Sequence, residues 1–163
     1  MPNILRDLAA MRAAILDTGP LIAFLDRAEQ HHRWVTEQVA KLDPPLLVCE
    51  PVLAEAMYLL GGFSRAQEAL FGLLENGALK IAFRINEHVP ALRKLHQKYR
   101  DRPMSLADAC IVRMAEIYER HAVLTLDSDF TVYRKDGRIP LALIHPVQSQ
   151  ERIRPAVSIG AQI

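Results

Sequence analysis

Short, almost wholly apolar runs alternate with helix-like segments along this chain, and that alternation constrains the fold more than any other feature of the sequence. Strands that are apolar on both faces are typical of a parallel sheet covered by helices, with right-handed crossovers between the strands. We therefore expect an α/β fold. The runs are AAIL (13–16), LLVC (46–49), LKIAF (79–83), AVLTL (122–126) and LALI (141–144).

Apolar residues recur at helical spacing in the segments between these runs. Ser64, Asn86 and Ser105 each precede such a segment, and we expect them to cap the helices that follow. A turn is expected at Asp136-Gly137. The helical segments are 19–26, 29–42, 52–60, 65–76, 86–99 and the segment that Ser105 opens.

The size and composition of the chain indicate one soluble globular domain. The chain has 163 residues, of which 50% are hydrophobic and 24% charged, and this is enough to bury a core without disulfides. We expect an N-terminal extension (1–12), a domain (13–147) and a loose C-terminal tail (148–163). The formal net charge of +1 excludes a global basic field, so nucleic acid would have to meet a local patch.

The sequence also indicates where the protein works. Cys49 and Cys110 each sit in an apolar run without a C-x-x-C partner, which indicates buried thiols in a reducing compartment. The first twelve residues hold no sustained apolar run, so we expect neither a signal peptide nor a membrane anchor. The expected location is the cytoplasm.

Two aspartates directly follow expected strands, Asp17 after AAIL and Asp127 after AVLTL. In a parallel sheet these positions belong to the carboxyl edge, where α/β proteins bind their ligands. An aspartate there also commonly caps the next helix or starts a turn. Both interpretations stay open for each residue, although two such aspartates favour a ligand site.

Glu55 is the only charged residue between positions 51 and 62. On a helix its neighbours include Val52, Tyr58 and Leu59, an apolar face, and a buried carboxylate needs a partner or a cation. The alternative is that the helix is partly exposed at this point and Glu55 reaches water.

Asp108 follows Ser105 by three positions, the spacing of a capping box. Capping alone explains this residue. The same position also aims a carboxylate from a helix N-terminus toward the strand ends, so Asp108 joins the candidate set.

A convergence of these acids predicts a metal site. Clustered carboxylates repel one another and require a hard divalent cation, Mg²⁺ or Mn²⁺. No His or Cys falls at zinc-ligand spacing, since His31 and His32 are adjacent. The chemistry suited to such a site is phosphodiester hydrolysis by metal-activated water. The candidate acids are Asp17, Glu55, Asp108 and Asp127.

The segment DSDFT also reads as D-x-D-x-T, the nucleophile signature of haloacid dehalogenase-type phosphatases. Such an enzyme needs this motif at the start of its core, with a lysine and an acidic pair later in the chain. Only a short segment follows Asp129, and Lys135 is its only lysine. We therefore interpret Asp127 as a metal ligand or orienter and not as a covalent nucleophile.

Taken together, ILDTGPLIAFLD, EQHHRW, VLAEAMYLL, SLADACIV and VLTLDSDF resemble the PIN-domain nucleases, including VapC-type toxins. The resemblance spans residues 14–145. It implies a three-layer α/β/α fold with a central, mostly parallel sheet. It also implies a metal-dependent endoribonuclease, the toxin of a type II toxin–antitoxin pair.

Matched residue by residue, the family's acidic set falls on the same four acids. The resemblance adds Asp129 as an accessory carboxylate and places Thr18 in the polar position after the first aspartate, and we expect Ser105 beside the site. The family's catalytic and metal-binding positions correspond to Asp17, Glu55, Asp108 and Asp127.

Basic residues gather in RKLHQKYRDR (93–102) and around the Asp136-Gly137 turn. Such runs are commonly a solvated helix face, and they also suit contacts with RNA phosphates. The candidates for these contacts are Arg100, Arg102, Arg134 and Lys135.

The apolar helices of residues 52–74 exceed the needs of one small core. They suggest a homodimer face or a groove for a partner such as an antitoxin. The rival function is a non-catalytic PIN-fold module that binds RNA or protein and uses its acids only as caps.

Overall fold

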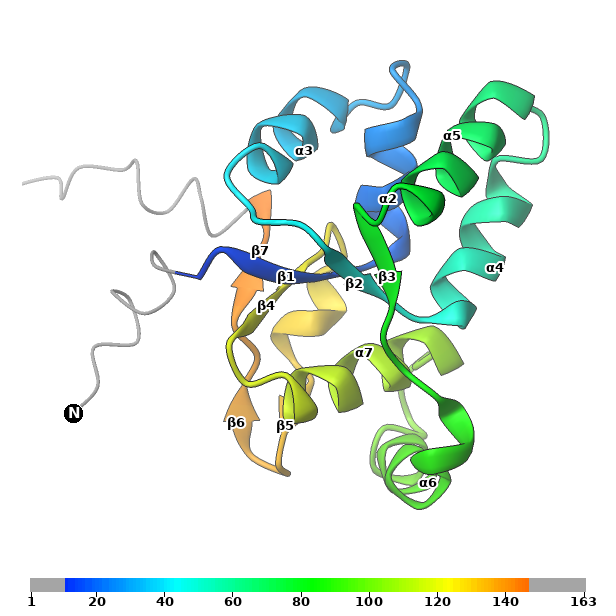
Figure 1. Ribbon diagram of the computed structural model, residues 1–163. Helices are drawn as coiled ribbons and strands as arrows, with labels where there is room; N and C mark the ends of the chain where they lie inside the picture. Colours follow the sequence, from blue (N-terminus) through cyan, green and yellow to red (C-terminus); the bar gives the residue numbers. More distant parts are fainter. Residues whose placement is uncertain (1–10, 147–163) are drawn as a thin grey trace, which may run out of the picture.

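The computed structural model describes residues 11–146, which form a five-stranded sheet between layers of helices (Figure 1). Its strand order is β3-β2-β1-β4-β7, and every neighbouring pair is parallel. The expected parallel α/β sheet is therefore confirmed. The strands are β1 (Ala13–Leu16), β2 (Leu46–Val48), β3 (Leu79–Ile81), β4 (His121–Leu124) and β7 (Leu143–Ile144).

The centre of the sheet is buried on both faces. Strands β1 and β4 pair in register with Ile15 opposite Val123, and both side chains are fully buried. Alternate side chains point to opposite faces of a strand, so only an apolar run can fill such a position.

Helices cover both faces of the sheet, which confirms the three-layer architecture. Figure 1 shows α2, α3 and α5 above the sheet and α6 and α7 below it. Helix α4 packs against both α2 and α7, so it joins the two helical layers at one rim. The helices are α2 (Thr18–Leu25), α3 (His32–Val39), α4 (Glu50–Leu59), α5 (Ser64–Glu75), α6 (Val89–Lys98) and α7 (Leu106–Ile117).

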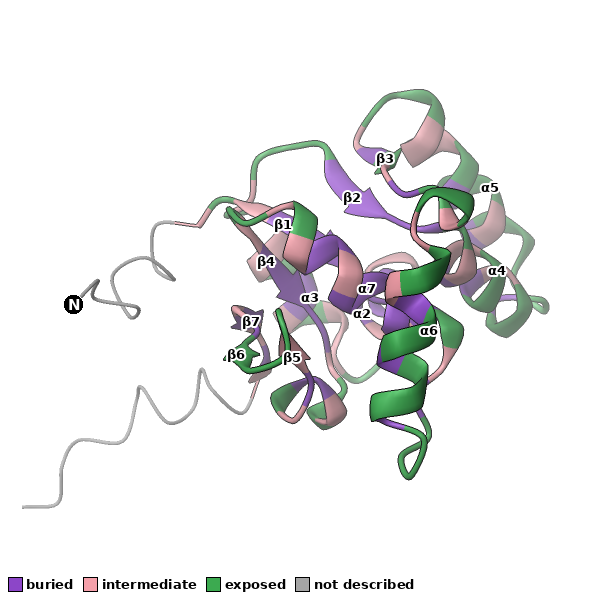
Figure 2. Cartoon of the chain, turned by 90° about the horizontal axis from the view of Figure 1, so that it is seen from below, coloured by how far each residue is buried: buried purple, intermediate pink, exposed green. Residues whose placement is uncertain are grey.

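Helix α7 is the buried helix of the lower layer, and α6 shields it from solvent (Figure 2). Cys110, Ile111 and Val112 of α7 are fully buried. Only Leu92 and Leu95 of α6 are buried among its described residues. This packing fixes the N-terminus of α7, and therefore Asp108, relative to the sheet.

A small hairpin follows the short 3₁₀ helix η2 (Ser128–Thr131). Strands β5 (Arg134–Lys135) and β6 (Ile139–Pro140) pair antiparallel, and the sequence pattern did not predict them. The turn between them contains Asp136 and Gly137 with φ angles of +50° and +81°. The expected turn is confirmed, and glycine adopts its left-handed conformation readily.

Two of the expected helix caps are wrong. Ser64 is the first residue of α5, because the carbonyl of Phe63 accepts the first helical bond, from the N–H of Gln67. Asn86 lies in the 3₁₀ helix η1 (Ile85–Glu87), and His88 is the cap of α6. The next helix begins late because Pro90 fits its first turn and cannot donate a backbone bond.

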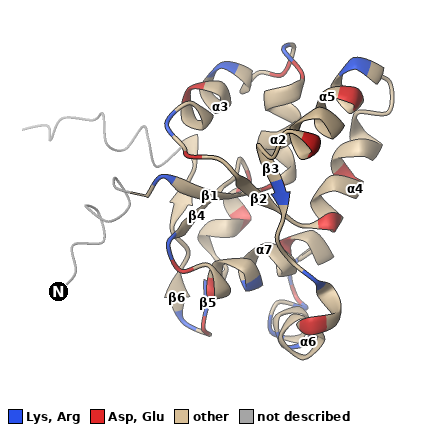
Figure 3. Cartoon of the chain, viewed as in Figure 1, with Lys and Arg blue, Asp and Glu red and all other residues tan. Residues whose placement is uncertain are grey.

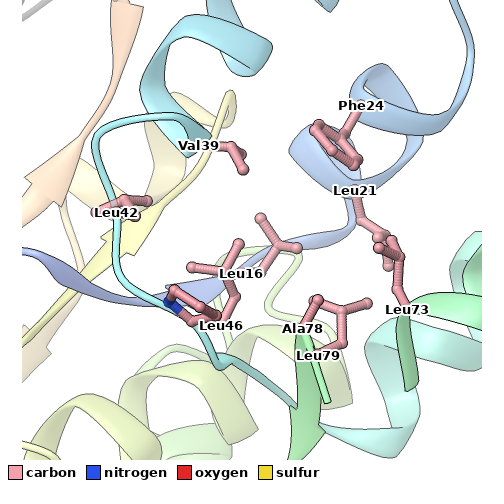
Figure 4. Close-up of a pocket in the computed structure, with 10 residues that line it drawn as sticks. Leu16, Leu21, Phe24, Val39, Leu42, Leu46, Leu73, Ala78 and Leu79 are labelled. Carbon is pink, nitrogen blue, oxygen red and sulfur yellow. The ribbon is translucent and has the colours of Figure 1, made fainter. Parts of the chain in front are cut away.

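An apolar cavity of about 220 Å³ lies between α2, α3, α5 and the sheet (Figure 4). Its lining includes Leu16 at the end of β1, Phe24 of α2, Val39 of α3 and Leu73 of α5. None of the helices in residues 11–146 is long and apolar enough to cross a membrane. Both cysteines are buried, as expected.

The predicted loose tail (148–163) and most of the predicted N-terminal extension (1–12) lie outside the described residues.

Candidate active site

Asp17 lies where β1 ends, at the carboxyl edge of the sheet. Its backbone N–H donates to the carbonyl of Leu124, 3.1 Å away, so it still pairs with the neighbouring strand. Its Oδ1 accepts the N–H of Thr18 at 2.8 Å, and its Oδ2 accepts the hydroxyl of Thr125 at 2.7 Å. Only 7% of the residue is exposed. Asp17 is thus a helix cap and a buried carboxylate at once.

Burial raises the pKa of Asp17 from 3.8 to about 6. The hydrogen bonds from Thr125 and Thr18 lower this pKa, while the charges of Asp108 and Asp127 raise it further. The ionised carboxylate is therefore held in an unfavourable environment, which a nearby cation would relieve.

Glu55 projects from α4 toward the start of α2 and is exposed. Its Oε2 accepts the hydroxyl of Thr18 at 2.8 Å, which connects it to the residue beside Asp17. The interpretation of Glu55 as a buried carboxylate on an apolar face is wrong, because its neighbours Tyr58 and Leu59 are themselves 85% and 59% exposed. The alternative, that the helix is exposed at this point, is confirmed.

Asp108 forms the expected capping box at the start of α7. Its N–H donates to Ser105 Oγ at 3.0 Å, and its Oδ2 accepts the N–H of Ser105 at 3.3 Å. The same Oδ2 accepts the hydroxyl of Tyr133 at 3.1 Å. Burial raises the pKa of Asp108, its hydrogen bonds with Ser105 and Tyr133 lower it, and Asp127 raises it.

Asp127 and Asp129 lie at the start of η2, beyond the end of β4. Asp127 is exposed and Asp129 half-buried. The N–H of Asp127 donates to Thr125 Oγ1 at 3.0 Å, and its Oδ1 accepts the N–H of Asp129 at 2.8 Å. Thr125 therefore contacts both Asp17 and Asp127.

Two residues in this network, Thr125 and Tyr133, were not predicted. Thr125 is a polar residue inside an apolar strand run and is fully buried, so its polarity was the available signal. Tyr133 is also fully buried. Burial and the negative charges of Asp108, Asp129 and Asp127 raise its pKa. No local pattern in the sequence marks it.

The structure brings the predicted acids to one edge of the sheet. The charges of Asp108 and Asp127 raise the pKa of Asp17, and the charge of Asp127 raises the pKa of Asp108. Glu55 joins them through Thr18. Within residues 11–146, no three His, Cys, Asp or Glu side chains are close enough to form a ready-made metal site. The donors are all carboxylate and hydroxyl oxygens, which suit Mg²⁺ or Mn²⁺ and not a softer metal.

The predicted phosphate-contact residues take different positions. Arg100 and Arg102 are exposed in the loop between α6 and α7. Arg134 turns its Nη1 onto the backbone carbonyls of residues 131, 132 and 133, and Lys135 is half-buried in β5. In the described part of the chain, both helical layers carry acidic and basic segments (Figure 3).

Comparison with known proteins agrees with this architecture. The PIN domain model matches residues 14–136, and the chain belongs to the PIN-domain family. The chain is 33% identical over 116 residues to Ribonuclease VapC26 of Mycobacterium tuberculosis, covering 69% of this chain and 85% of that protein.

A solved structure described as a toxin-antitoxin complex from Klebsiella pneumoniae shares the fold. Its TM-score is 0.58 at 20% identity, and the match covers 80% of this chain and 95% of that one.

Proposed function

We propose that the protein is a metal-dependent endoribonuclease, the toxin of a type II toxin–antitoxin pair, that hydrolyses RNA phosphodiester bonds. The observation that carries this proposal is the buried carboxylate of Asp17, whose pKa rises to about 6 beside Asp108 and Asp127. A carboxylate kept in this environment at a sheet edge is costly unless it serves a cation. Membership of the PIN-domain family and the likeness to a ribonuclease support the same activity.

Five carboxylates would hold the metal ion, directly or through water. Mg²⁺ commonly keeps several waters when it binds protein carboxylates, which suits acids that are not closed into a ready-made site within the described residues. When bound, Mg²⁺ or Mn²⁺ activates the attacking water and stabilises charge on the scissile phosphate. The residues are Asp17, Glu55, Asp108 and Asp127, with Asp129 as the accessory carboxylate.

The hydroxyl groups of the site position these carboxylates. Thr125 donates to Asp17, and Tyr133 donates to Asp108. Thr18 holds Asp17 with its backbone N–H and Glu55 with its hydroxyl. Each hydrogen bond limits the rotation of a carboxylate, and such supporting contacts typically change metal affinity or activity about 10–100-fold.

Cleavage of a fluorescent single-stranded RNA with Mn²⁺, and with EDTA in its place, tests the proposal. We expect Asp17→Asn and Asp108→Asn each to lose activity by about 10²-fold or more while keeping the fold. Glu68→Gln is the matched control, because Glu68 is an exposed acid on α5. Activity like the wild type in either aspartate variant would refute the assigned roles.

The rival function, a non-catalytic module, is supported by the capping bonds that the carboxylates of Asp108 and Asp127 accept from the backbone N–H groups of Ser105 and Asp129. Thermal melting with and without Mn²⁺ separates the two functions, since a ligand that binds only the native state raises its stability. The nuclease is expected to melt at a higher temperature with Mn²⁺, and the module at an unchanged temperature.

We place the protein in the cytoplasm, with an antitoxin and a second copy of itself as partners. Helices α4 and α5 expose a set of large apolar side chains that a partner would cover. Light scattering is expected to give the mass of a dimer, and a clean monomer would contradict that part of the proposal. The exposed side chains are Tyr58, Leu59, Phe63 and Phe71.

A further inference from the structure

A second cleft lies away from the acids, between α6, α7 and the β5–β6 hairpin. Its volume is about 510 Å³. Four cationic and two carboxylate side chains line the cleft. The hydrogen bonds and ion pairs that these side chains already make determine which charges remain to bind a ligand. The charged lining residues are Lys94, Lys98, Arg113, Arg134, Glu116 and Asp136.

One carboxylate of this cleft is already satisfied. Glu116 accepts a hydrogen bond from Arg113 at 3.4 Å and another from the backbone N–H of Asp136 at 2.6 Å. Its side chain is only 12% exposed. Glu116 therefore neutralises the charge of Arg113 and anchors the hairpin through Asp136. It does not neutralise the lysines of the cleft.

The remaining cations outnumber the remaining acid, Asp136. Lys94 is exposed and has no hydrogen bond or ion pair within the described residues. Lys98 donates to the carbonyl of Gly137 at 2.6 Å, which ties α6 to the tip of the hairpin. Arg134 uses only Nη1 in its bonds to backbone carbonyls, which leaves Nε and Nη2 without a hydrogen-bond partner in residues 11–146.

The cleft is connected to the acidic site by two tyrosines. Tyr133 directly precedes Arg134 and donates its hydroxyl to Asp108. Tyr99 accepts the backbone N–H of Arg134 at 2.9 Å and packs edge-on against the ring of Tyr133, with ring centroids 5.0 Å apart. The two tyrosines therefore fix the cations of the cleft relative to the acids of the candidate active site.

We infer that this cleft binds the phosphate backbone of the RNA strand beyond the scissile bond. The inference rests on the proposed nuclease function. Lysine and arginine side chains in a groove are the usual ligands of nucleic-acid phosphates. Among the described residues, no aromatic ring lines the cleft, so it offers no platform on which bases would stack. The contact is therefore with the backbone and independent of base sequence.

Binding of single-stranded RNA to Lys94→Ala in EDTA, measured by fluorescence anisotropy over a range of salt concentrations, tests this site. We expect weaker binding of a long RNA and a slope of log K against log salt that is shallower by about 0.7, because the variant neutralises one phosphate fewer. A short RNA that does not reach the cleft should show no difference between Lys94→Ala and the wild type. Lys41→Ala is the control, because Lys41 is an exposed lysine after α3, on the other helical layer.

The outcomes separate the cleft from the nuclease. If the wild type cleaves RNA while Lys94→Ala and Lys41→Ala give equal salt slopes, the proposal that the cleft binds RNA is wrong. The proposed nuclease function would still stand. A wild type that neither binds nor cleaves RNA would overturn both. If Lys94→Ala weakens binding of pyrophosphate but not of long RNA, the cleft serves a free phosphate ligand and the inference is wrong.

Discussion

Replacing Asp17 with asparagine should stabilise the protein in the absence of metal. Burial raises the pKa of Asp17 from its ordinary value of 3.8 to about 6 in the folded chain. A shift of one pKa unit corresponds to about 1.4 kcal/mol, so ionised Asp17 costs the fold up to about 3 kcal/mol at neutral pH. Asparagine carries no charge and avoids this cost.

The expected gain is smaller than that limit because asparagine changes the hydrogen bonds of the site. Its amide oxygen can still accept the N–H of Thr18, and its amide nitrogen can donate to Thr125 Oγ1. Bonds to a charged carboxylate are stronger than these neutral ones. We expect a net gain of about 2 kcal/mol, or about 4–8 °C in Tm for a domain of this size.

The pH dependence has a definite sign. The folded-state pKa is raised, so the folded protein holds its proton more tightly than the unfolded chain does. The contribution of Asp17 to the stability of the wild type falls as pH rises from 3.8 to about 6. Above that interval, the wild type is at its least stable relative to the variant. The advantage of Asp17→Asn should therefore be full at neutral pH and vanish below pH 3.8.

Chemical denaturation in EDTA, at neutral pH and at a pH below 3.8, measures this difference. Glu68→Gln serves as the control for loss of an exposed acid. The reasoning is refuted if Asp17→Asn is no more stable than the wild type at neutral pH, or if its advantage does not change with pH.

Three further substitutions test the supporting contacts. Thr125→Val removes the hydroxyl that Asp17 accepts, and calorimetry should show Mn²⁺ affinity reduced about 10-fold or more; unchanged affinity would mean that Thr125 does not orient Asp17. Tyr133→Phe keeps the buried ring but loses the bond to Asp108, and single-turnover RNA cleavage should slow by about 10-fold with an unchanged fold. Ser105→Ala breaks the capping box and should cost about 1 kcal/mol in urea denaturation, whereas no loss of stability would show that the cap contributes nothing.

Local patterns in the sequence were enough to predict the sheet and two of the acids at its edge. The AAIL run is wholly apolar and the AVLTL run is apolar except for Thr125, because β1 and β4 are buried on both faces. The residues that end such runs must lie at the carboxyl edge. The Ser105–Asp108 capping box depends on a spacing of three residues and was also predictable.

The exposure of Glu55 could not be predicted in the same way. Its apolar neighbours suggested a buried face, but Tyr58 and Leu59 point to solvent. An apolar helix face looks the same in the sequence whether it packs inside the domain or is left uncovered. Only tertiary packing, with α4 placed at the rim between two layers, distinguishes the two.

The hydroxyl contacts of the site depend on long-range pairing. Thr125 reaches Asp17 across 108 positions of the chain, through the pairing of β4 with β1. Tyr133 reaches Asp108 only because β5, which follows it, packs against α7. The basic cleft likewise depends on Lys98 reaching Gly137, 39 positions away. Such contacts have no local sequence signal.

Calorimetric titration of Mn²⁺ into the wild type and into Asp17→Asn/Asp108→Asn tests the central claim most directly. We predict stoichiometric binding by the wild type and its loss in the double variant, with both proteins folded by circular dichroism. Absence of binding by the wild type, even with RNA present, would contradict the metal site and leave the carboxylates as helix caps in a non-catalytic module.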